Sequence, residues 1–150
     1  MNNLKDILSK AQHYCGYQER CHSEVKSKLY EWGATTDLVN ETMSNLIEHG
    51  FLNEERFALA YCRGKFIHKH WGKNKILEGL KSKQISAYCI KKGMQEIDDD
   101  TYIETLHKLI DQYWQKQKGL SEFDKKGKTA RFALQKGYES SLVWEIINKK

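Results

Sequence analysis

The chain has 150 residues, of which 39% are hydrophobic and 30% are charged, and it contains no proline. A globular chain of this length can bury about 68–70% of its unfolded surface, so a hydrophobic core is possible. The lack of proline excludes collagen-like, PxxP and proline-rich linker sequences. The formal net charge of +5, from 25 Lys and Arg against 20 Asp and Glu, allows an acidic partner without requiring one.

Neither a membrane span nor a secretory leader is expected. The longest apolar run covers residues 57–62 and is far shorter than the roughly 20 residues of a transmembrane helix. Residues 1–6 lack the basic and apolar segments of a signal peptide. The four cysteines, at positions 15, 21, 62 and 89, form no CxxC pair and are expected to stay reduced and buried. The sequence therefore predicts a cytoplasmic chain.

Apolar residues recur at helical spacing along the whole chain, and strand-like alternation is hard to find. In chain order the periodic positions are Val25, Leu29 and Trp32, then Leu38, Val39, Met43, Leu46 and Ile47, then Phe57, Ala60, Tyr61, Ile76, Leu77 and Leu80. Glycines at 33, 50 and 137 each follow a periodic segment, where a left-handed residue ends a helix. Candidate N-caps are Ser23, Thr36, Asn53, Ser86, Asp100 or Thr101, Asp124 and Ser140. The expected fold is all-α.

The helical pattern repeats about every 50 residues. Gly33, Gln84 and Gly137 are equivalent points, 51 and 53 residues apart. Apolar equivalents lie four residues earlier at Leu29, Leu80 and Ala133, six later at Val39, Ile90 and Val143, and upstream at Tyr14, Tyr61 and Tyr113. We therefore expect one domain, residues 1–150, made of three tandem three-helix repeats at approximately 1–50, 51–98 and 99–150. Because units this small are marginal alone, neighbours should share apolar surface in an elongated, curved array.

Several motifs resemble those of the RecX family of recombination regulators. Tyr14-Cys15, residues 18–25 and Lys28-Leu29 resemble its first-unit signature. Residues 51–58, Phe-Leu-Asn-Glu-Glu-Arg-Phe-Ala, resemble its second-unit opening, which continues through residues 63–66 and Trp71-Gly72-Lys73. Lys128, Arg131-Phe132 and Lys136-Gly137-Tyr138 resemble its third unit. The similarity covers nearly the entire chain, and its family-motif positions are Glu19, Arg20, Glu54, Glu55, Arg56 and Phe57.

Three residues depart from the family pattern. Gln84 stands where the family tends to have glycine, Gly79 where it usually has a polar helix former, and Ala133 where it usually has leucine. Gly79 is expected to weaken its helix by about 1 kcal/mol relative to alanine. Gln84 makes the left-handed backbone conformation less favourable at that position than glycine would.

The resemblance implies an all-helical regulator of RecA with no catalytic residues and no cofactor. It implies binding in the groove of the RecA–DNA filament, where the regulator restrains strand exchange, ATP turnover and co-protease activity during recombination, DNA repair and the SOS response. The expected partners are the RecA filament and, weakly and electrostatically, single- and double-stranded DNA. A monomer is expected.

Two runs of basic residues are candidate binding surfaces for phosphates, which are contacted by Lys and Arg. The first run consists of Arg63, Lys65, Lys69, Lys73, Lys75, Lys81 and Lys83, with the single acid Glu78 among them and Trp71 as a possible stacking residue. The second run includes Lys116, Lys118, Lys125, Lys126, Lys128, Arg131 and Lys136. The alternative interpretation is a solvated helix face with a core tryptophan. Glu54 and Glu55 are candidates for a contact with the partner protein. The alternative interpretation is that these acids stabilise a helix N-terminus.

Metal and catalytic sites are not expected. His13, Cys15, Cys21 and His22 lack the spacing of a zinc site, and Asp98, Asp99 and Asp100 are expected to form a solvated junction. No GxSxG, HExxH or phosphate-loop motif occurs. The competing function is a stand-alone basic helical-repeat protein that binds DNA without a recombinase.

Overall fold

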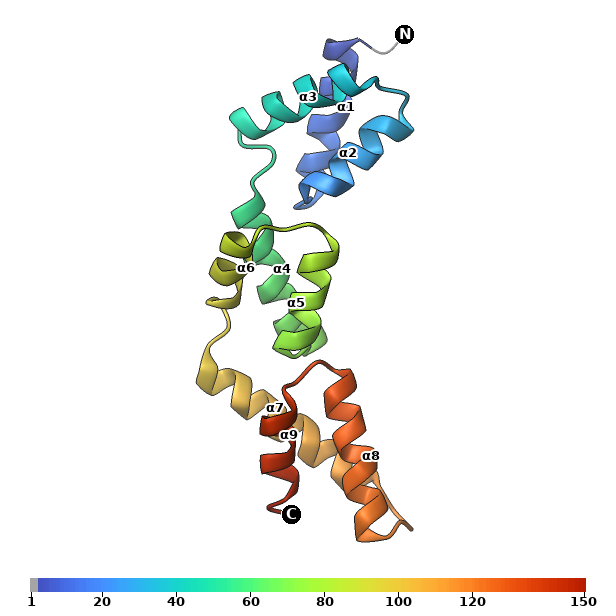
Figure 1. Cartoon of the computed structure of the whole chain (residues 1–150), viewed down its shortest axis with the longest axis vertical. Helices are drawn as coiled ribbons and strands as arrows, with labels where there is room; N and C mark the ends of the chain where they lie inside the picture. Colours follow the sequence, from blue (N-terminus) through green and yellow to red (C-terminus); the bar gives the residue numbers. More distant parts are fainter. Residues whose placement is uncertain (1–2) are drawn as a thin grey trace.

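The computed structural model describes residues 3–150, which form nine α-helices and no strand (Figure 1). The first two residues of the predicted first unit, which also begin the segment considered for a leader, lie outside the described residues. The helices are α1 (Leu4–Tyr17), α2 (His22–Glu31), α3 (Thr36–Glu48), α4 (Glu54–Lys69), α5 (Lys73–Ser82), α6 (Ala87–Met94), α7 (Asp99–Lys116), α8 (Glu122–Gln135) and α9 (Ser140–Ile147). The predicted all-α fold is confirmed.

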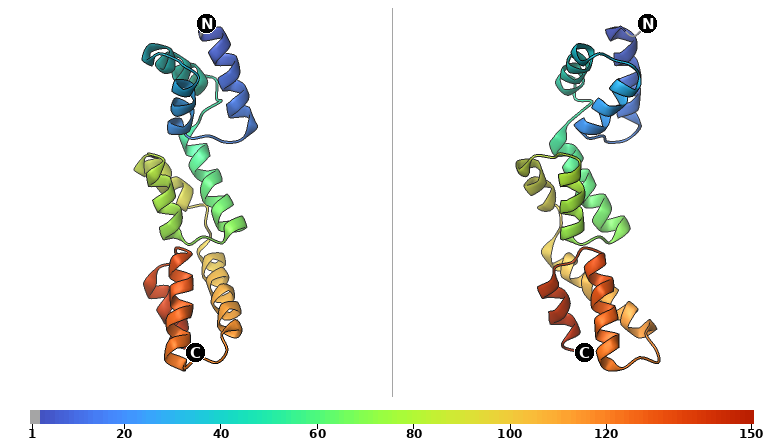
Figure 2. Two further views of the ribbon diagram at one scale, coloured as in Figure 1. Left: turned by 90° about the vertical axis from the view of Figure 1, so that its right-hand side faces the viewer. Right: turned by 45° about the vertical axis from the view of Figure 1, so that its right-hand side comes forward.

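The helices pack in three groups of three: α1–α3, α4–α6 and α7–α9, called here the first, second and third units. The units follow one another along the long axis, so the molecule is an elongated array (Figure 1). In the left view of Figure 2, the first helix of each unit (α1, α4 and α7) lies on the right of the array. The second helix of each unit (α2, α5 and α8) lies on the left. No helix among residues 3–150 is long and apolar enough to cross a membrane.

The backbone confirms the repeat register that the sequence predicts. The equivalent residues Gly33, Gln84 and Gly137 all have positive φ, at 90°, 61° and 101°. Gln84 therefore adopts the left-handed conformation that glycine would adopt more easily. The residues four positions earlier, Leu29, Leu80 and Ala133, are at most 1% exposed.

Most helices start at a polar N-cap side chain, and the sequence placed these caps only in part. Asn53 and Ser86 are N-caps as predicted. The other predicted caps, Ser23, Thr36, Asp100 or Thr101, Asp124 and Ser140, are wrong: the caps are Cys21, Thr35, Asp98, Ser121 and Glu139. Each lies one to three residues earlier. Thr35, Asp98 and Ser121 each accept from the N–H three residues downstream, which leaves the later polar residue inside the first turn, whereas Cys21 and Glu139 make no side-chain cap bond.

Two hydrophobic cores hold the array together. One belongs to the first unit, and it includes Ile7, Leu29 and Leu46. The other runs through the second and third units without a break, from Phe57 to Ile147, and it also takes in Cys21. The expectation of shared apolar surface is thus confirmed between the second and third units. All four cysteines are buried and free, as predicted.

The junction between the second and third units is made of main chain as well as side chains. Gly72 N donates to Lys136 O at 2.7 Å, and Asn74 N donates to Gly137 O at 2.9 Å. Tyr102 Oη accepts from Lys73 N at 2.9 Å and donates to the Glu139 carboxylate. Burial raises the pKa of Tyr102 far above its ordinary value, so the phenol stays neutral.

Tyr138 completes this junction. Its ring lies 5.1 Å from the ring of Tyr102, and its Oη donates to His70 O at 2.9 Å. The Tyr102 ring in turn lies 5.8 Å from that of Phe66 on α4. These contacts fix the third unit against the second.

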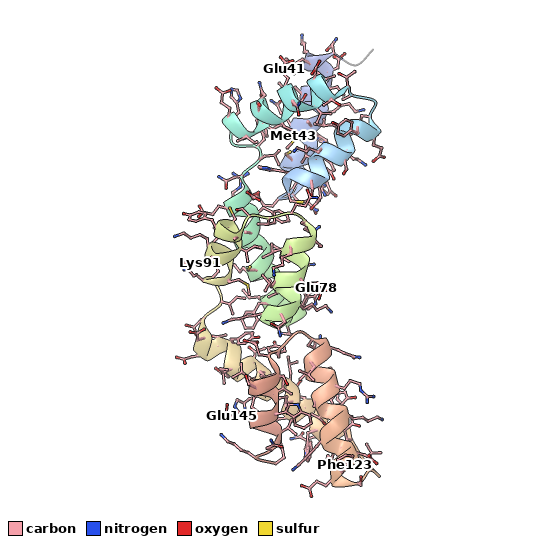
Figure 3. The ribbon with its side chains drawn as sticks, viewed as in Figure 1. Glu41, Met43, Glu78, Lys91, Phe123 and Glu145 are labelled. Atoms are coloured by element: carbon pink, nitrogen blue, oxygen red, sulfur yellow. The ribbon has the colours of Figure 1, made fainter. Side chains whose placement is uncertain are left out.

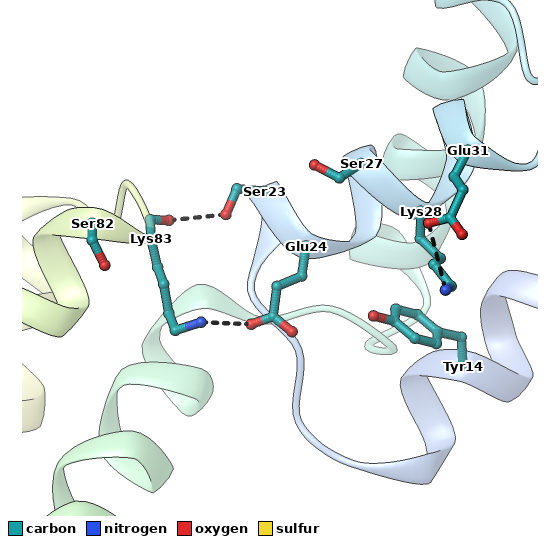
Figure 4. A pocket seen from close by; sticks show the side chains of 8 residues that line it. All are labelled: Tyr14, Ser23, Glu24, Ser27, Lys28, Glu31, Ser82 and Lys83. Atoms are coloured by element: carbon teal, nitrogen blue, oxygen red, sulfur yellow. Dashed lines mark hydrogen bonds and ion pairs between the residues drawn. The ribbon is translucent and has the colours of Figure 1, made fainter.

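The junction between the first and second units is thinner and more polar. Ser23 Oγ donates to Lys83 O at 3.2 Å, and Lys83 Nζ lies 3.3 Å from Glu24 Oε1 (Figure 4). Arg56 Nε lies 2.8 Å from Glu19 Oε2 on the other side of the same junction. Each of these three contacts between the units uses at least one side chain.

Candidate nucleic-acid interface

Trp71 is the centre of an aromatic and basic cluster on α4 and α5. Lys65 Nζ and Lys75 Nζ lie 4.8 and 4.5 Å from its ring centroid, so two cations from two helices converge on one indole. The ring of Tyr61 meets Trp71 edge-on, with centroids 6.5 Å apart. We call Tyr61, Lys65, Trp71 and Lys75 the Trp71 cluster.

Gly79 allows Tyr61 to take this position. A Cβ at residue 79 would lie 2.1 Å from Tyr61 Oη, closer than any real contact. Gly79 is expected to lower the stability of α5. Its lack of a side chain leaves space for the ring of Tyr61 on the neighbouring helix α4. Burial raises the pKa of Tyr61, against the opposing charge of Lys83. A shallow groove of about 250 Å³ continues from here, lined by Trp71, Lys75, Glu78, Gly79 and Ser82.

Three other members of the first basic run are paired with acids. Arg63 pairs with Glu96 after α6, Lys73 Nζ lies 3.2 Å from Asp99 Oδ1, and Lys83 pairs with Glu24. Lys69 and Lys81 are exposed. Although Glu78 is the only acid within the run in sequence, the fold brings three further carboxylates to it from other parts of the chain. The sequence could not show these pairings because each spans 26 residues or more.

The second basic run lies on α8 and beside it. Lys125 Nζ lies 4.3 Å from the ring centroid of Trp114, and Lys126 Nζ lies 3.6 Å from Glu122 Oε1. Lys128 and Arg131 are exposed and form no ion pair with an acid in residues 3–150. The two runs meet where Lys136 Nζ donates to Lys69 O at 3.3 Å.

The family-motif residues mostly hold the units together. Glu54 Oε1 accepts from Ser86 N at 2.9 Å and so connects the start of α4 to the start of α6. Arg56 bridges to Glu19, and its Nη2 donates to Phe51 O at 3.3 Å. Phe57 is 5% exposed. Glu55 lies in the first turn of α4, where an acid complements the helix dipole.

One cluster was missing from the sequence-based candidates. In the first unit, Lys10 and Arg20 lie over the rings of Trp32 and Tyr14 at 4.6 and 3.9 Å. Tyr14 is the repeat equivalent of Tyr61, so the recurrence of Tyr14, Tyr61 and Tyr113 was the signal that could have revealed it. Figure 3 shows the side chains along the whole array.

No group of three His, Cys, Asp or Glu residues in the 3–150 range could hold a metal ion. Burial raises the pKa of the Cys62 thiol to about 11, so it stays protonated and unreactive at neutral pH.

Comparison with known proteins identifies the family. The model of the second three-helix domain of RecX matches residues 53–94, and the model of its third three-helix domain matches residues 100–147. The matched segments cover α4–α6 and all but the first residue of α7–α9, and together they make up more than half of the chain. The chain belongs to the RecX family.

Curated RecX proteins align over most of the chain. The regulatory protein RecX of Clostridium perfringens strain 13 is 26% identical over 132 residues, which are 87% of this chain and 61% of that protein. The regulatory protein RecX of Pelodictyon phaeoclathratiforme is 23% identical over 146 residues, 97% of this chain and 87% of that protein. The chain thus spans about three fifths of the length of the clostridial relative.

Solved RecX structures have the same fold. The crystal structure of RecX from Lactobacillus salivarius superposes with a TM-score of 0.87 at 23% identity, over 97% of this chain and 95% of that one. A second crystal structure, of regulatory protein RecX, gives a TM-score of 0.88 at 22% identity, over 98% of this chain and 73% of that one. The predicted helical repeat array is confirmed.

Proposed function

We propose that this chain regulates the RecA recombinase by binding the RecA–DNA filament and restraining strand exchange, ATP hydrolysis and co-protease activity, with no reaction of its own. Family membership and the elongated array support the proposal. An extended repeat offers one long surface, which suits binding to another extended object.

The observation that carries the proposal is the Trp71 cluster. Lys65 and Lys75 offer cations to phosphates at the point where Trp71 offers an aromatic ring. Electrostatic contacts of this kind speed the encounter of the chain with DNA and fix its position along the strand. Specificity for a filament comes from contacts with the protein partner. The nearby ion pairs of Lys73 and Lys83 are partly exposed, and such pairs contribute about 0–1 kcal/mol, so a phosphate can replace either carboxylate.

The proposal includes the molecular setting. Residues 1–150 act as one RecX-like domain with units at approximately 1–50, 51–98 and 99–150. The chain works in the cytoplasm as a monomer whose contact with DNA alone is weak. Regulation then follows from differential binding, because a ligand shifts a filament only as far as it prefers one of the filament's states.

The direct test measures RecA-promoted ATP hydrolysis on single-stranded DNA with substoichiometric amounts of the purified chain. We expect a fall in the hydrolysis rate and shorter filaments by electron microscopy. An unchanged rate and filament length, with folded protein, would contradict the proposal.

Charge reversal locates the surface. Lys65→Glu with Lys75→Glu should abolish most of the inhibition, because both cations of the Trp71 cluster then repel phosphate. Lys73 is left unchanged because a carboxylate there would face Asp99. The matched control is Lys91→Glu with Lys92→Glu on α6, which should retain inhibition. Equal loss in both variants would point to net charge and not to this surface.

The competing function, DNA binding without a recombinase, is separated by a gel-shift titration over a salt series. Tight binding of the chain to DNA alone, weakening steeply with salt, would favour it. Weak binding that increases strongly when RecA coats the DNA supports the filament regulator.

A further inference from the structure

A pocket of about 290 Å³ opens on the first unit, between the last turns of α1 and the end of α2. It belongs neither to the two basic runs nor to the Trp71 cluster. Its lining is aromatic and cationic, and it consists of Lys10, His13, Tyr14, Tyr17, Arg20 and Trp32.

The inner wall of the pocket is held in place. The rings of Tyr14 and Trp32 meet edge-to-face, with centroids 6.0 Å apart and planes at 79°. Arg20 lies over the Tyr14 ring, its Nε donating to Tyr14 O at 3.4 Å and its Nη1 3.8 Å from Glu24 Oε2. The Arg20 side chain is only 14% exposed, so this wall is in place before a ligand arrives.

The outer rim is exposed. Tyr17, at the end of α1, is 81% exposed, which makes it one of the most exposed large apolar side chains of the described residues. Lys10 is exposed over Trp32 and forms no ion pair with an acid in residues 3–150. An exposed cation–π contact contributes little free energy. The ammonium group of Lys10 can therefore leave the ring of Trp32 to bind an anion.

The lining selects a ligand that is both flat and anionic. It carries two permanent cations, Lys10 and Arg20, and no carboxylate. A nucleobase with its phosphate has both properties, since the base stacks on aromatic rings and the phosphate pairs with Lys and Arg. Duplex DNA offers only base edges in its grooves, so an unstacked base is needed to reach a ring face.

We propose that this pocket binds one unstacked base of single-stranded DNA, with Tyr17 and Trp32 contacting the base and Lys10 the adjoining phosphate. The inference rests on the proposed function, because the DNA strand of a filament is the source of such bases. It adds a stacking site in the first unit to the Trp71 cluster in the second.

The test uses the full chain and a thymidine oligonucleotide that contains one 2-aminopurine, whose fluorescence falls when it stacks on an aromatic ring. Tyr17→Ala and Lys10→Glu change exposed side chains and should leave the circular dichroism spectrum unchanged. We expect each variant to bind roughly 5- to 50-fold more weakly and to lose the part of the quenching that does not come from the Trp71 cluster. The matched controls are Tyr88→Ala, an exposed tyrosine near Lys92 in the second unit, and Lys5→Glu on α1; both should stay within about twofold of the unmodified chain.

The outcomes are distinct from those of the RecA assay. Quenching and affinity in Tyr17→Ala and Lys10→Glu that match the controls, or an unmodified chain that does not quench, would overturn the inference even if RecA is inhibited. Complete competition by micromolar ATP would also overturn it, in favour of a free nucleotide. Quenching that depends on Tyr17 and Lys10 supports the inference even if RecA activity is unaffected, in which case only the proposed function fails.

Discussion

Gly72 and Gly137 bring two stretches of backbone into direct contact where the second and third units meet. A Cβ on Gly72 would lie 2.3 Å from the Gly137 carbonyl carbon, which cannot move without displacing the chain that carries Tyr138. We therefore expect Gly72→Ala to lower the free energy of unfolding by about 1–3 kcal/mol, as overpacking does. Urea denaturation followed by circular dichroism measures this.

Gly64 provides the control for that substitution. It lies within α4, and a Cβ there would meet nothing within 4 Å. Gly64→Ala should raise stability by about 0.5–1 kcal/mol, because alanine loses less backbone entropy in a helix. A Gly72→Ala variant as stable as Gly64→Ala would show that the junction is looser than its hydrogen bonds indicate.

Single positions show where sequence reasoning succeeded and where it stopped. Spacing alone made Gly33, Gln84 and Gly137 equivalent points, since periodicity is a local property, and the left-handed backbone expected of the two glycines also occurs at Gln84. It counted Gly79 only as a cost, because the Tyr61 ring that needs this space comes from a helix 18 residues earlier. The reason for a glycine is visible only when its spatial neighbours are known.

At the scale of the helix, Asp98 caps α7. Its carboxylate accepts from Thr101 N and Thr101 Oγ1, both at 2.9 Å, and these bonds lower the pKa of Asp98 below its ordinary 3.8. The contribution to stability is therefore complete above pH 3.8 and disappears as the pH falls through the lowered value.

Asp98→Asn tests this pH dependence. The amide keeps an acceptor oxygen but does not titrate, so the stability advantage of the unmodified chain at neutral pH should shrink below pH 3.8. Thermal unfolding of both proteins from pH 7 to pH 2.5 provides the comparison, and every other carboxyl group is common to the two. A difference in stability that is constant over this range would contradict the assigned cap.

The basic runs show the same limit at the scale of elements. The sequence predicted Lys65, Trp71 and Lys75 as members of one site, and their side chains do converge. It also included Arg63, which instead turns toward Glu96 at the end of α6. A linear run says which residues are close along the chain, whereas the 3.6-residue turn of each helix distributes them over several faces.

For the whole molecule, the two cores predict which parts fold alone. A fragment of residues 51–150 keeps the continuous core of the second and third units, and we expect it to unfold in one cooperative thermal transition. A fragment of residues 99–150 would expose Tyr102 and Tyr138, which are 2% and 1% exposed in the full chain, and we expect no cooperative transition. Differential scanning calorimetry separates the two outcomes, and a sharp transition in the shorter fragment would show that the third unit is self-sufficient.

Amide hydrogen exchange should show the same division in the intact chain. Amides of α1–α3 are expected to exchange as one group, faster than those of α4–α9, because the first unit has its own small core and a polar junction. Cys21→Ala removes its apolar link to the larger core and should widen the difference in exchange rates. Identical protection across all nine helices of residues 3–150 would contradict this division.

The hydrogen bonds from Gly72 N and Asn74 N to the carbonyls of Lys136 and Gly137 have a consequence for how such arrays diverge. The spacing of the second and third units is set by peptide groups, which a substitution retains unless it brings proline to residue 72 or 74 or a side chain to Gly72, so this step of the array keeps its pitch as surface residues change. The step between the first and second units depends on the side chains of Glu19, Glu24, Arg56 and Lys83. Single substitutions of these side chains can therefore change the pitch at that end of the molecule.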